Sequence, residues 1–391
     1  MAKNIGQLEY CCGCGGCETI CPKKCITIGP DENGFWRAQC NNETCIQCGL
    51  CLRVCPFALD EKERSPLDPL AAYAAVSQND TFYQQSSSGG LFSQFAEGFF
   101  RSNNGIVWGC AWDKHLKATH ICIENVQDLG RLRRSKYVQS DTRGVFEIIK
   151  GQLASGRHVL FAGTPCQVNG LRRYLAKDHP NLWTVEILCH GVPSPGLFQS
   201  HIEYLQGKYH KKLTGYEFRQ KVSGKEKVYH AIYHFEDGRQ KTVPFYGDPY
   251  YNAFYWHKSL DECCYECPYA GYQRFGDVTI GDYAWGKKWH PEFAKYSELS
   301  CVIVNTEKGE RMIASIKNAI LCRPTLLEHI KERNETLNKK VDRPKERDGF
   351  YRECQENYGR WARRYFLSAN YIKQLKIWEP LRWVKHSIKK R

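Results

Sequence analysis

Cysteines at regular spacing are the residues of this sequence whose type and position could do chemistry. The chain has 21 cysteines among 391 residues, and eleven of them lie between Cys11 and Cys55. In that stretch the pattern C-x2-C-x2-C-x3-C-P occurs twice, from Cys11 to Pro22 and from Cys45 to Pro56. Three thiolates separated by two residues can bind three corners of one metal cluster, whereas the fourth lies too far along the chain and reaches a second cluster.

The repeated spacing therefore predicts two [4Fe–4S] clusters, each of which takes its fourth ligand from the other motif. Glycines between the cysteines let backbone N–H groups approach the sulfurs. A zinc module, the alternative, usually supplies two C-x2-C pairs, and the tight triple fits it poorly. The expected ligands are Cys11, Cys14, Cys17 and Cys55 for the first cluster, and Cys45, Cys48, Cys51 and Cys21 for the second.

This arrangement resembles a bacterial-type two-cluster ferredoxin domain, which we place at residues 1–62. Cys12, Cys25 and Cys40 lie outside the motif, and we interpret them as packing or incidental thiols. The following stretch, 59–70, is charged and contains two prolines, which is typical of a linker.

The composition favours a folded protein of a reducing compartment. Apolar residues make up 42% of the chain, which is enough for a sizeable core. The N-terminus lacks the apolar segment of a signal peptide, and no run of about 18 apolar residues predicts a membrane-spanning helix. We therefore expect a cytoplasmic protein whose cysteines bind metal.

The positive charge is concentrated at the C-terminus. The formal net charge is +14, and the residues after Gly359 hold ten Lys or Arg and one Glu, or +9. The other residues carry only +5, so we expect no general nucleic-acid-binding surface. The basic and aromatic tail could lie on an anionic membrane at its inner face, or it could be a terminal helix docked on the body.

Between about 70 and 330 the pattern alternates between strands and helices. We predict strands at 71–78, 105–113, 157–163, 182–189, 277–282 and 300–306, and helices at 91–100, 141–156 and 165–177. Residues 214–246 read as β-hairpins with a turn at Asp237-Gly238. The fold class is thus an α/β body with a mixed or mostly parallel sheet (70–330), preceded by the α+β ferredoxin domain and followed by a basic helical tail (331–391).

Five segments of the body, in this order, resemble the family of coenzyme F-420 hydrogenase/dehydrogenase beta subunits. They are SSSGGLFSQF (86–95), RRSKYVQSD (133–141), FAGTPCQVNGL (161–171), LCHGVPSP (188–195), and CCYECPYAG with FGDVTIGDYAWG (263–286). The resemblance to the bacterial branch, which carries an N-terminal ferredoxin domain, covers roughly residues 1–330.

The resemblance implies an iron–sulfur flavoprotein oxidoreductase that binds FAD. Archaeal members pass electrons between a flavin and a deazaflavin coenzyme, and many bacterial members accompany polysaccharide-biosynthesis genes. We carry over the flavin and the redox role but not the deazaflavin, and the substrate stays open. The rival interpretation is a non-catalytic electron carrier or scaffold for a partner enzyme. The expected partner is a redox protein or a small-molecule electron donor or acceptor.

Candidate flavin contacts lie in three of these segments. The turn Ser87-Ser88-Gly89-Gly90 opens a helix and could hold a phosphate, or it could be a simple N-cap turn. Lys136 and Tyr137 could bind a phosphate and stack on a ring, or they could lie on a basic surface strand. His190 is a plausible polar contact near the redox centre, as is Asp282, although core or turn roles suit both.

A third [4Fe–4S] cluster is expected in the body. Cys166 and Cys189 each follow a predicted strand, and parallel neighbours would bring both thiols to the carboxyl edge of the sheet. Cys264 and Cys267 form a C-x2-C pair that can bind two corners of a cluster. Cys263 could replace Cys264, and the alternative to the cluster is two buried thiols and an unrelated surface pair.

Overall fold

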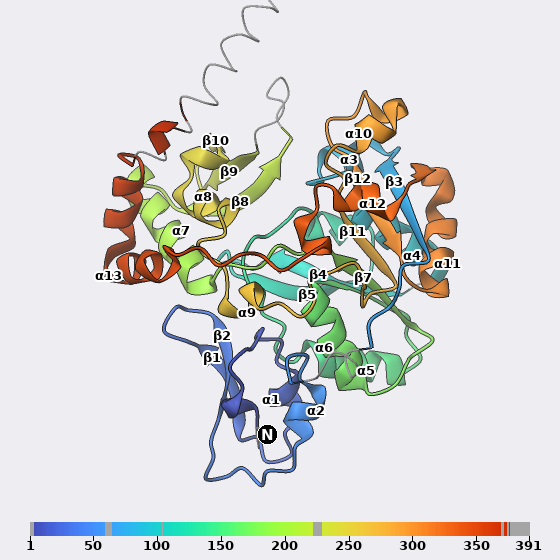
Figure 1. Cartoon of the computed structure of the whole chain (residues 1–391), viewed down its shortest axis with the longest axis horizontal. Helices are drawn as coiled ribbons and strands as arrows, with labels where there is room; N and C mark the ends of the chain where they lie inside the picture. Colours follow the sequence, from blue (N-terminus) through green and yellow to red (C-terminus); the bar gives the residue numbers. More distant parts are fainter. Residues whose placement is uncertain are drawn as a thin grey trace, which may run out of the picture.

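The computed structural model describes residues 4–58, 65–103, 105–221, 229–368, 371–373 and 375. Three sheets organise them, and Figure 1 shows the N-terminal part of the chain beneath a larger body. No helix among these residues is long and apolar enough to cross a membrane.

The N-terminal domain consists of a hairpin and two short helices. Strands β1 (Ile26–Pro30) and β2 (Trp36–Cys40) pair antiparallel, and the helices α1 (Gly16–Ile20) and α2 (Leu50–Val54) pack against each other. Gly15 and Gly49 precede the two helices with φ of 78° and 74°, a left-handed conformation that a side chain would strain. A 3-10 turn, η1 (Ile5–Gln7), lies next to β2.

An eight-stranded mixed sheet forms the centre of the body. Its order is β13-β3-β12-β11-β7-β6-β4-β5. Strands β4, β6, β7 and β11 run parallel, and the other pairings are antiparallel. The bounds are β3 Ala71–Ser77, β4 Ile106–Trp112, β5 Ala118–Ile123, β6 Val159–Gly163, β7 Leu182–Ile187, β11 Val278–Asp282, β12 Ser300–Val304 and β13 Ile320–Pro324.

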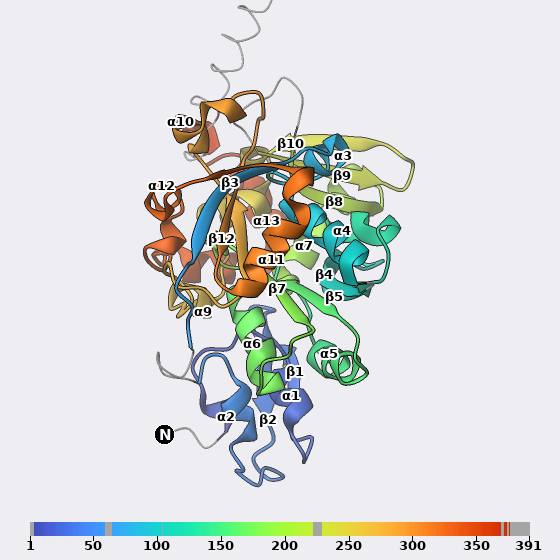
Figure 2. The same cartoon turned by 90° about the vertical axis from the view of Figure 1, so that its right-hand side faces the viewer.

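Helices cover both faces of this sheet, because successive side chains of its central strands point to opposite faces and most of them are buried. On one face Val107 and Leu160 contact α4 (Leu91–Asn103) and α11 (Glu307–Ile316). On the other face Trp108 and Phe161 contact α5 (Val145–Ala154) and α6 (Pro165–Leu175). Figure 2 shows α5 and α6 between the sheet and the N-terminal domain. The predicted mixed α/β body is confirmed.

A second, aromatic-rich unit packs beside the large sheet. Its three strands, β8 (Leu213–Gln220), β9 (His230–Phe235) and β10 (Gln240–Pro244), form the predicted hairpins, in the order β10-β9-β8. They pack with α7 (Pro195–Tyr209), α8 (Pro249–Tyr255) and α13 (Arg347–Tyr365). Short elements complete the described chain: α3 Asp80–Gln84, α9 Glu262–Tyr265, α10 Gly286–Trp289, α12 Leu327–Lys331, and the 3-10 turns η2 Gln127–Leu132, η3 Phe245–Gly247, η4 Pro291–Phe293, η5 Lys317–Ala319 and η6 Glu335–Leu337.

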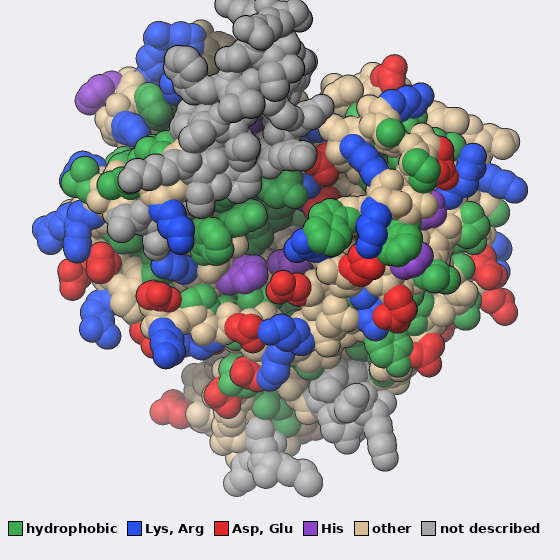
Figure 3. Space-filling model, turned by 45° about the horizontal axis from the view of Figure 1, so that its top comes forward, with side chains coloured by type: hydrophobic (Ala, Val, Ile, Leu, Met, Phe, Trp, Pro, Cys, Tyr) green, Lys and Arg blue, Asp and Glu red, His purple; other side chains and the backbone are tan. Residues whose placement is uncertain are grey.

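The first half of the predicted basic tail is part of this unit. Phe350, Tyr351, Tyr358 and Ala362 of α13 are buried in the same core as α7 and β8. A docked helix therefore replaces the expected separate tail up to residue 365, because α13 carries enough apolar side chains to be buried. Residues 376–391 lie outside the described residues. Figure 3 shows Lys and Arg interspersed with Asp and Glu across one face, without a single basic patch.

Candidate metal centres and an adjoining basic cavity

The first predicted ligand set converges at the two short helices of the N-terminal domain. Burial, followed by the charges of Cys14, Cys11, Cys55 and Cys51, raises the pKa of Cys17, so the predicted ligands of the first set lie near one another, with Cys51 of the second set close by. The N–H of Gly13 donates to Cys11 Sγ at 3.3 Å. Four mutually repelling thiolates with backbone donors suit a cationic iron–sulfur core.

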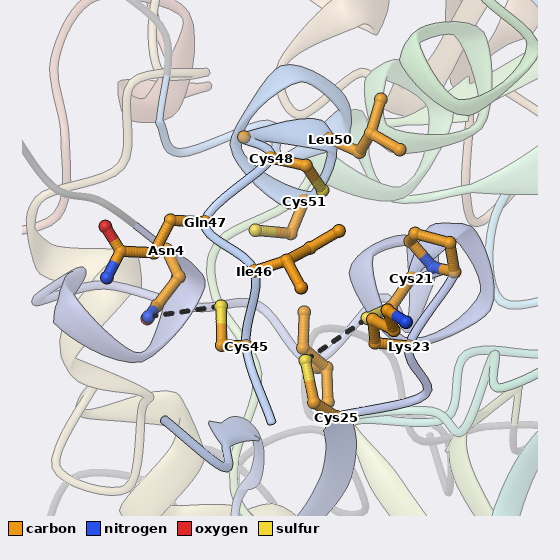
Figure 4. Close-up of a pocket in the computed structure, with 13 residues that line it drawn as sticks. Asn4, Cys21, Lys23, Cys25, Cys45, Ile46, Gln47, Cys48, Leu50 and Cys51 are labelled. Atoms are coloured by element: carbon orange, nitrogen blue, oxygen red, sulfur yellow. Dashed lines mark hydrogen bonds between the residues drawn. The ribbon is translucent and has the colours of Figure 1, made fainter. Parts of the chain in front are cut away.

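The second set surrounds a pocket at the outer end of the same domain. Cys21, Cys45, Cys48 and Cys51 all line it, as Figure 4 shows. Asn4 Nδ2 donates to Cys45 Sγ at 3.7 Å, and Cys48 is exposed to solvent. The pocket and its four thiols fit the predicted second cluster, and this set is the more accessible of the two.

The four body cysteines come together from three separate segments of the chain. Burial, followed by the charges of Cys264, Cys166 and Cys267, raises the pKa of Cys189 well above its ordinary value. Burial and two of the same neighbours raise the pKa of Cys267 to about 12. Cys263 is buried, its backbone N–H donates to the Asp261 carboxylate, and its thiol bonds to that of Cys264. The packing thus favours Cys264 over Cys263 as the fourth thiol of this set.

Local structure fixes these thiols at the edge of the sheet. Cys166 lies in the first turn of α6, directly after β6, where Thr164 and Gln167 form a capping box. Cys189 follows β7, and its Sγ accepts from the N–H of Gly191 at 3.4 Å. Because β6 and β7 are parallel neighbours, the segments that follow them emerge at the same edge.

Cys12 joins the first set to the body set. Hydrogen bonds to the Cys14 and Cys166 thiols raise the pKa of Cys12 well above its ordinary value. Cys12, Cys14, Cys166 and Cys267 also belong to one apolar cluster with Phe146 and Phe161. The thiol that sequence reasoning set aside as incidental is therefore the contact between two predicted metal centres.

Polar contacts hold the N-terminal domain on the body around this point. Arg37 on β2 forms an ion pair with Asp261, with Nη1 to Oδ2 at 2.9 Å, and the Asp261 side chain is fully buried. Gln139 accepts from the N–H of Trp36 at 2.7 Å and donates to the carbonyl of Cys12 at 3.0 Å. The two parts form one interface, so their thiol sets keep a defined spacing.

The Ser87–Gly90 turn is packed against β12. The N–H of Gly89 donates to Ser300 Oγ at 2.8 Å, and Ser88 Oγ donates to the carbonyl of Leu299. A Cβ on Gly89 would lie 2.7 Å from the carbonyl oxygen of Ala75, so only glycine fits there. The predicted phosphate cradle thus has its Gly89 N–H already engaged, and the turn serves to position its neighbours.

The side chains of Lys136 and Tyr137 make contacts within the protein. The Lys136 ammonium donates to the carbonyls of Arg131, Arg133 and Arg134, with the shortest distance 2.6 Å, and burial lowers its pKa to about 8. The Tyr137 ring stacks on Phe254 at 4.2 Å between ring centres. The phosphate and ring contacts predicted for these two residues stay predictions.

The loop that Lys136 holds forms one wall of a basic cavity. The cavity has a volume of about 410 Å³, a size typical of small-ligand sites. Arg134 within it pairs with Glu217, whereas Arg133 bonds to Gln85 and lies over the Phe82 ring at 4.6 Å. Its lining comprises Gln85, Trp112, Gly130, Arg131, Arg133, Arg134, Ser135, Lys136, Tyr216 and Glu217.

A buried network of charges lies between this cavity and the body thiols. Lys221 donates to the carbonyls of Ser86 and Ser88 at 2.7 and 2.5 Å, and burial lowers its pKa to about 7. Arg219, which is buried, forms ion pairs with Asp282 and Glu298.

His190, next to Cys189, lies within the field of that network. Burial lowers the pKa of His190, and the charges of Asp282 and Arg219 act on it in opposite directions. The predicted residues His190, Ser87 and Lys136 therefore lie around one connected region.

Sequence reasoning missed several residues of this region. The arginines of the cavity occur as the run R-L-R-R at 131–134, which was a visible signal. Cys12, Arg37 and Gln139 gave no such signal, because their roles depend on contacts with residues far away in the sequence.

Comparison with known families finds a match for the N-terminal domain and another for the body. Residues 156–325 match the family model that describes the C terminus of the beta subunit of coenzyme F420 hydrogenase/dehydrogenase. Residues 10–59 match the 4Fe-4S dicluster domain. The chain thus carries the C-terminal domain of coenzyme F420 hydrogenase/dehydrogenase beta subunits together with a 4Fe-4S dicluster domain. It is an iron–sulfur protein with an oxidoreductase electron-transfer role.

Similar proteins occur in Methanosarcina and Methanocaldococcus species. One of the subunits of the F(420)H(2) dehydrogenase of Methanosarcina mazei is 21% identical over 80% of this chain and 84% of its own length. The coenzyme F420-dependent sulfite reductase of Methanocaldococcus jannaschii is 23% identical over 81% of this chain, which spans only 47% of that protein. A chain of the F420-reducing [NiFe] hydrogenase complex from Methanosarcina barkeri has a TM-score of 0.48 at 15% identity, and covers 70% of this chain and 90% of its own.

Proposed function

We propose that this protein is an iron–sulfur oxidoreductase that transfers electrons between its ferredoxin domain and a flavin-type cofactor in the body. The main observation that supports this proposal is the contact of Cys12 with both Cys14 and Cys166. This contact brings the first thiol set next to the body set. The second set, which contains the exposed Cys48, would form the outer end of a series of three clusters.

The body set supports a third [4Fe–4S] cluster. Cys166, Cys189, Cys264 and Cys267, which are half-buried, would hold it, as their mutual proximity suggests. A cationic core would offset the repulsion that otherwise raises the pKa of Cys189. Cys12 then lies between two clusters as a neutral thiol, within hydrogen-bond reach of a ligand of each.

The basic cavity supports the flavin-type cofactor. Arg131, Arg133 and Arg134 would face its phosphate, and Trp112 offers an apolar wall. When bound, such a cofactor supplies the conversion between single electrons and hydride chemistry. FAD, which the family resemblance implies, and coenzyme F420, which the names of two relatives contain, are the two molecules to test.

The experiment is anaerobic purification of the full chain followed by iron and cofactor analysis. We expect about 12 irons per chain. We also expect tight binding of FAD or F420, and reduction of the bound cofactor through the clusters. Arg131→Glu with Arg133→Glu should weaken cofactor binding at least tenfold without lowering the iron content. Arg101→Glu, an exposed change on α4, is the matched control.

A carrier or scaffold for a partner enzyme is the second candidate function. The similar Methanosarcina mazei protein is named as one of several subunits of a dehydrogenase, which favours a redox partner protein. Full iron content with no binding of either cofactor would support this candidate and contradict the oxidoreductase. A cytoplasmic location and a role in polysaccharide biosynthesis stay predictions.

A further inference from the structure

Two thiols outside the duplicated motif lie against the second ligand set. Cys25 directly precedes β1 and is buried, and Cys40 ends β2. The strand register pairs Ile26 with Cys40, so the two cysteines lie at the same end of the hairpin. Figure 4 shows the Cys25 side chain between those of Cys21 and Cys45.

The distances between three of these sulfurs suit a single metal ion, and the thiol of Cys21 lies beside one of the three. The Sγ atoms of Cys25, Cys40 and Cys45 all lie within 4.8 Å of one another, and Cys21 Sγ lies 3.4 Å from Cys25 Sγ. Four thiolates around one tetrahedral Zn²⁺ at about 2.3 Å are separated by roughly 3.8 Å. A cubane needs wider spacing, because each of its four thiolates binds a different iron.

We propose that Cys25, Cys40 and Cys45, with Cys21 as the fourth ligand, form a tetrahedral thiolate site for one thiophilic divalent cation such as Zn²⁺. Asn4, whose amide donates to Cys45 Sγ at 3.7 Å, orients that ligand from outside the site. Cys48 and Cys51 belong to the predicted cubane alone, whereas Cys25 and Cys40 belong to the mononuclear site alone.

Shared ligands make the two metal centres mutually exclusive. Cys21 and Cys45 cannot bind a cubane and a single ion at once, so the cation occupies the position of the second cluster. That cluster would be the most accessible of the three, and a redox-inactive ion there would close the outer end of the electron path. This consequence rests on the proposed function, whereas cation binding itself does not.

The test separates the two centres through their unshared ligands. In the full chain with Cys48→Ser and Cys51→Ser, the second cubane cannot form and the other centres keep the protein folded. Anaerobic addition of Co²⁺, a visible probe of tetrahedral thiolate sites, should then give one tightly bound ion that Zn²⁺ displaces. Adding Cys25→Ser or Cys40→Ser to this variant should remove that ion, whereas Cys122→Ser, an exposed control on β5, should not.

A second measurement, the iron content of single variants, distinguishes loss of the cation site from misfolding and from failure of the proposed function. In the otherwise unchanged chain, Cys25→Ser and Cys40→Ser should leave the iron content at the wild-type value. Co²⁺ binding that survives both substitutions, or iron loss equal to that of Cys48→Ser, would overturn the mononuclear site. Absence of FAD and F420 would contradict only the proposed function.

Discussion

The thiols of the N-terminal domain and those of the body are built in opposite ways. The first two sets draw all their ligands from the stretch between Cys11 and Cys55, where local spacing and two left-handed glycines place them. The body set joins Cys166, Cys189 and the Cys264–Cys267 pair, from segments far apart in sequence. A local site depends mainly on its own motif, whereas an assembled site depends on every contact that holds its segments together.

The supports of the assembled set illustrate this dependence. Tyr269, which follows Cys267, donates to the carbonyl of Pro56 at 2.8 Å and accepts from Asn169 of α6 at 3.0 Å. Nearby, Arg274 and Glu186 form a buried ion pair. The same contacts thus position the C-x2-C pair and bind the ferredoxin domain, so disturbing one part should be felt in the other.

The largest effect is expected from removing a thiol of the assembled set. Cys267→Ser should lower the iron content from about 12 to about 8 per chain and stop electron flow to the body, and Cys166→Ser should do the same. The measurement is iron analysis with stopped-flow reduction. Cys48→Ser is the matched control, since it should cost the same iron from the local sets. An iron content of about 8 in wild type and both variants alike would rule out the third cluster.

Weakening the interface between the N-terminal domain and the body should affect the assembled thiol set more than the two local sets. Arg37→Ala leaves the buried Asp261 carboxylate without its partner, which we expect to cost about 3 kcal/mol in the free energy of unfolding. Denaturant titration measures the loss, and iron analysis should still find the local clusters.

Arg157→Ala is the control for that interface change, because it removes an exposed pair with Glu124 that should cost about 1 kcal/mol or less. Equal losses for the two variants would contradict a stabilising role for the Arg37–Asp261 pair.

The pH dependence of stability should also come from the assembled region. Burial lowers the pKa of Lys221 to about 7, whereas the unfolded chain keeps that proton up to its ordinary value of 10.5. The unfolded state binds more protons between these values, so this group makes stability rise with pH by up to about 1.4 kcal/mol per unit, and its full penalty is present below pH 7.

Lys221→Met should flatten that rise in thermal melts between pH 7 and 9, and Lys114→Met, at an exposed position, should not. An unchanged slope in Lys221→Met would show that the lysine keeps its proton in the folded protein.

A smaller effect, on a cluster potential, is expected from changing Cys12, which contacts both the first thiol set and the body set. Cys12→Ala removes a thiol donor that reaches Cys14 and Cys166, without removing a predicted ligand. A net hydrogen bond of about 1 kcal/mol corresponds to roughly 40 mV for one electron, so one cluster potential should fall by that order. Redox titration followed by electron paramagnetic resonance measures it. Cys110→Ala is the control, and iron loss in Cys12→Ala would show that Cys12 is itself a ligand.

The least effect on either kind of site is expected from the C-terminus. Residues 376–391 hold six Lys or Arg and one Glu, whereas α13 before them is packed in the body core. Deleting 376–391 should weaken binding to anionic liposomes at low salt and leave iron content and potentials unchanged. If the full-length protein does not bind such liposomes, the prediction of membrane contact is wrong.

Local spacing along the chain is enough to predict the chemistry of the N-terminal domain. The duplicated cysteine motif predicted the dicluster domain, because neighbouring residues along the chain supply three ligands of each cluster. Nearly continuous apolar runs predicted β4, β6 and β7, because strands that are buried on both faces require such runs. The capping box at Thr164 follows from neighbouring residues as well.

Which of these segments lie in contact depends on the tertiary structure. The Cys12 contact, the Arg37–Asp261 pair and the grouping of Cys25 with Cys40 join residues whose separate surroundings carry no signal. The hydrogen bonds of the Lys136 ammonium to carbonyls of its own loop likewise carry no signal in the sequence. The physical reason is that the long-range packing of side chains, and not local spacing, sets which polar groups are left to face a ligand.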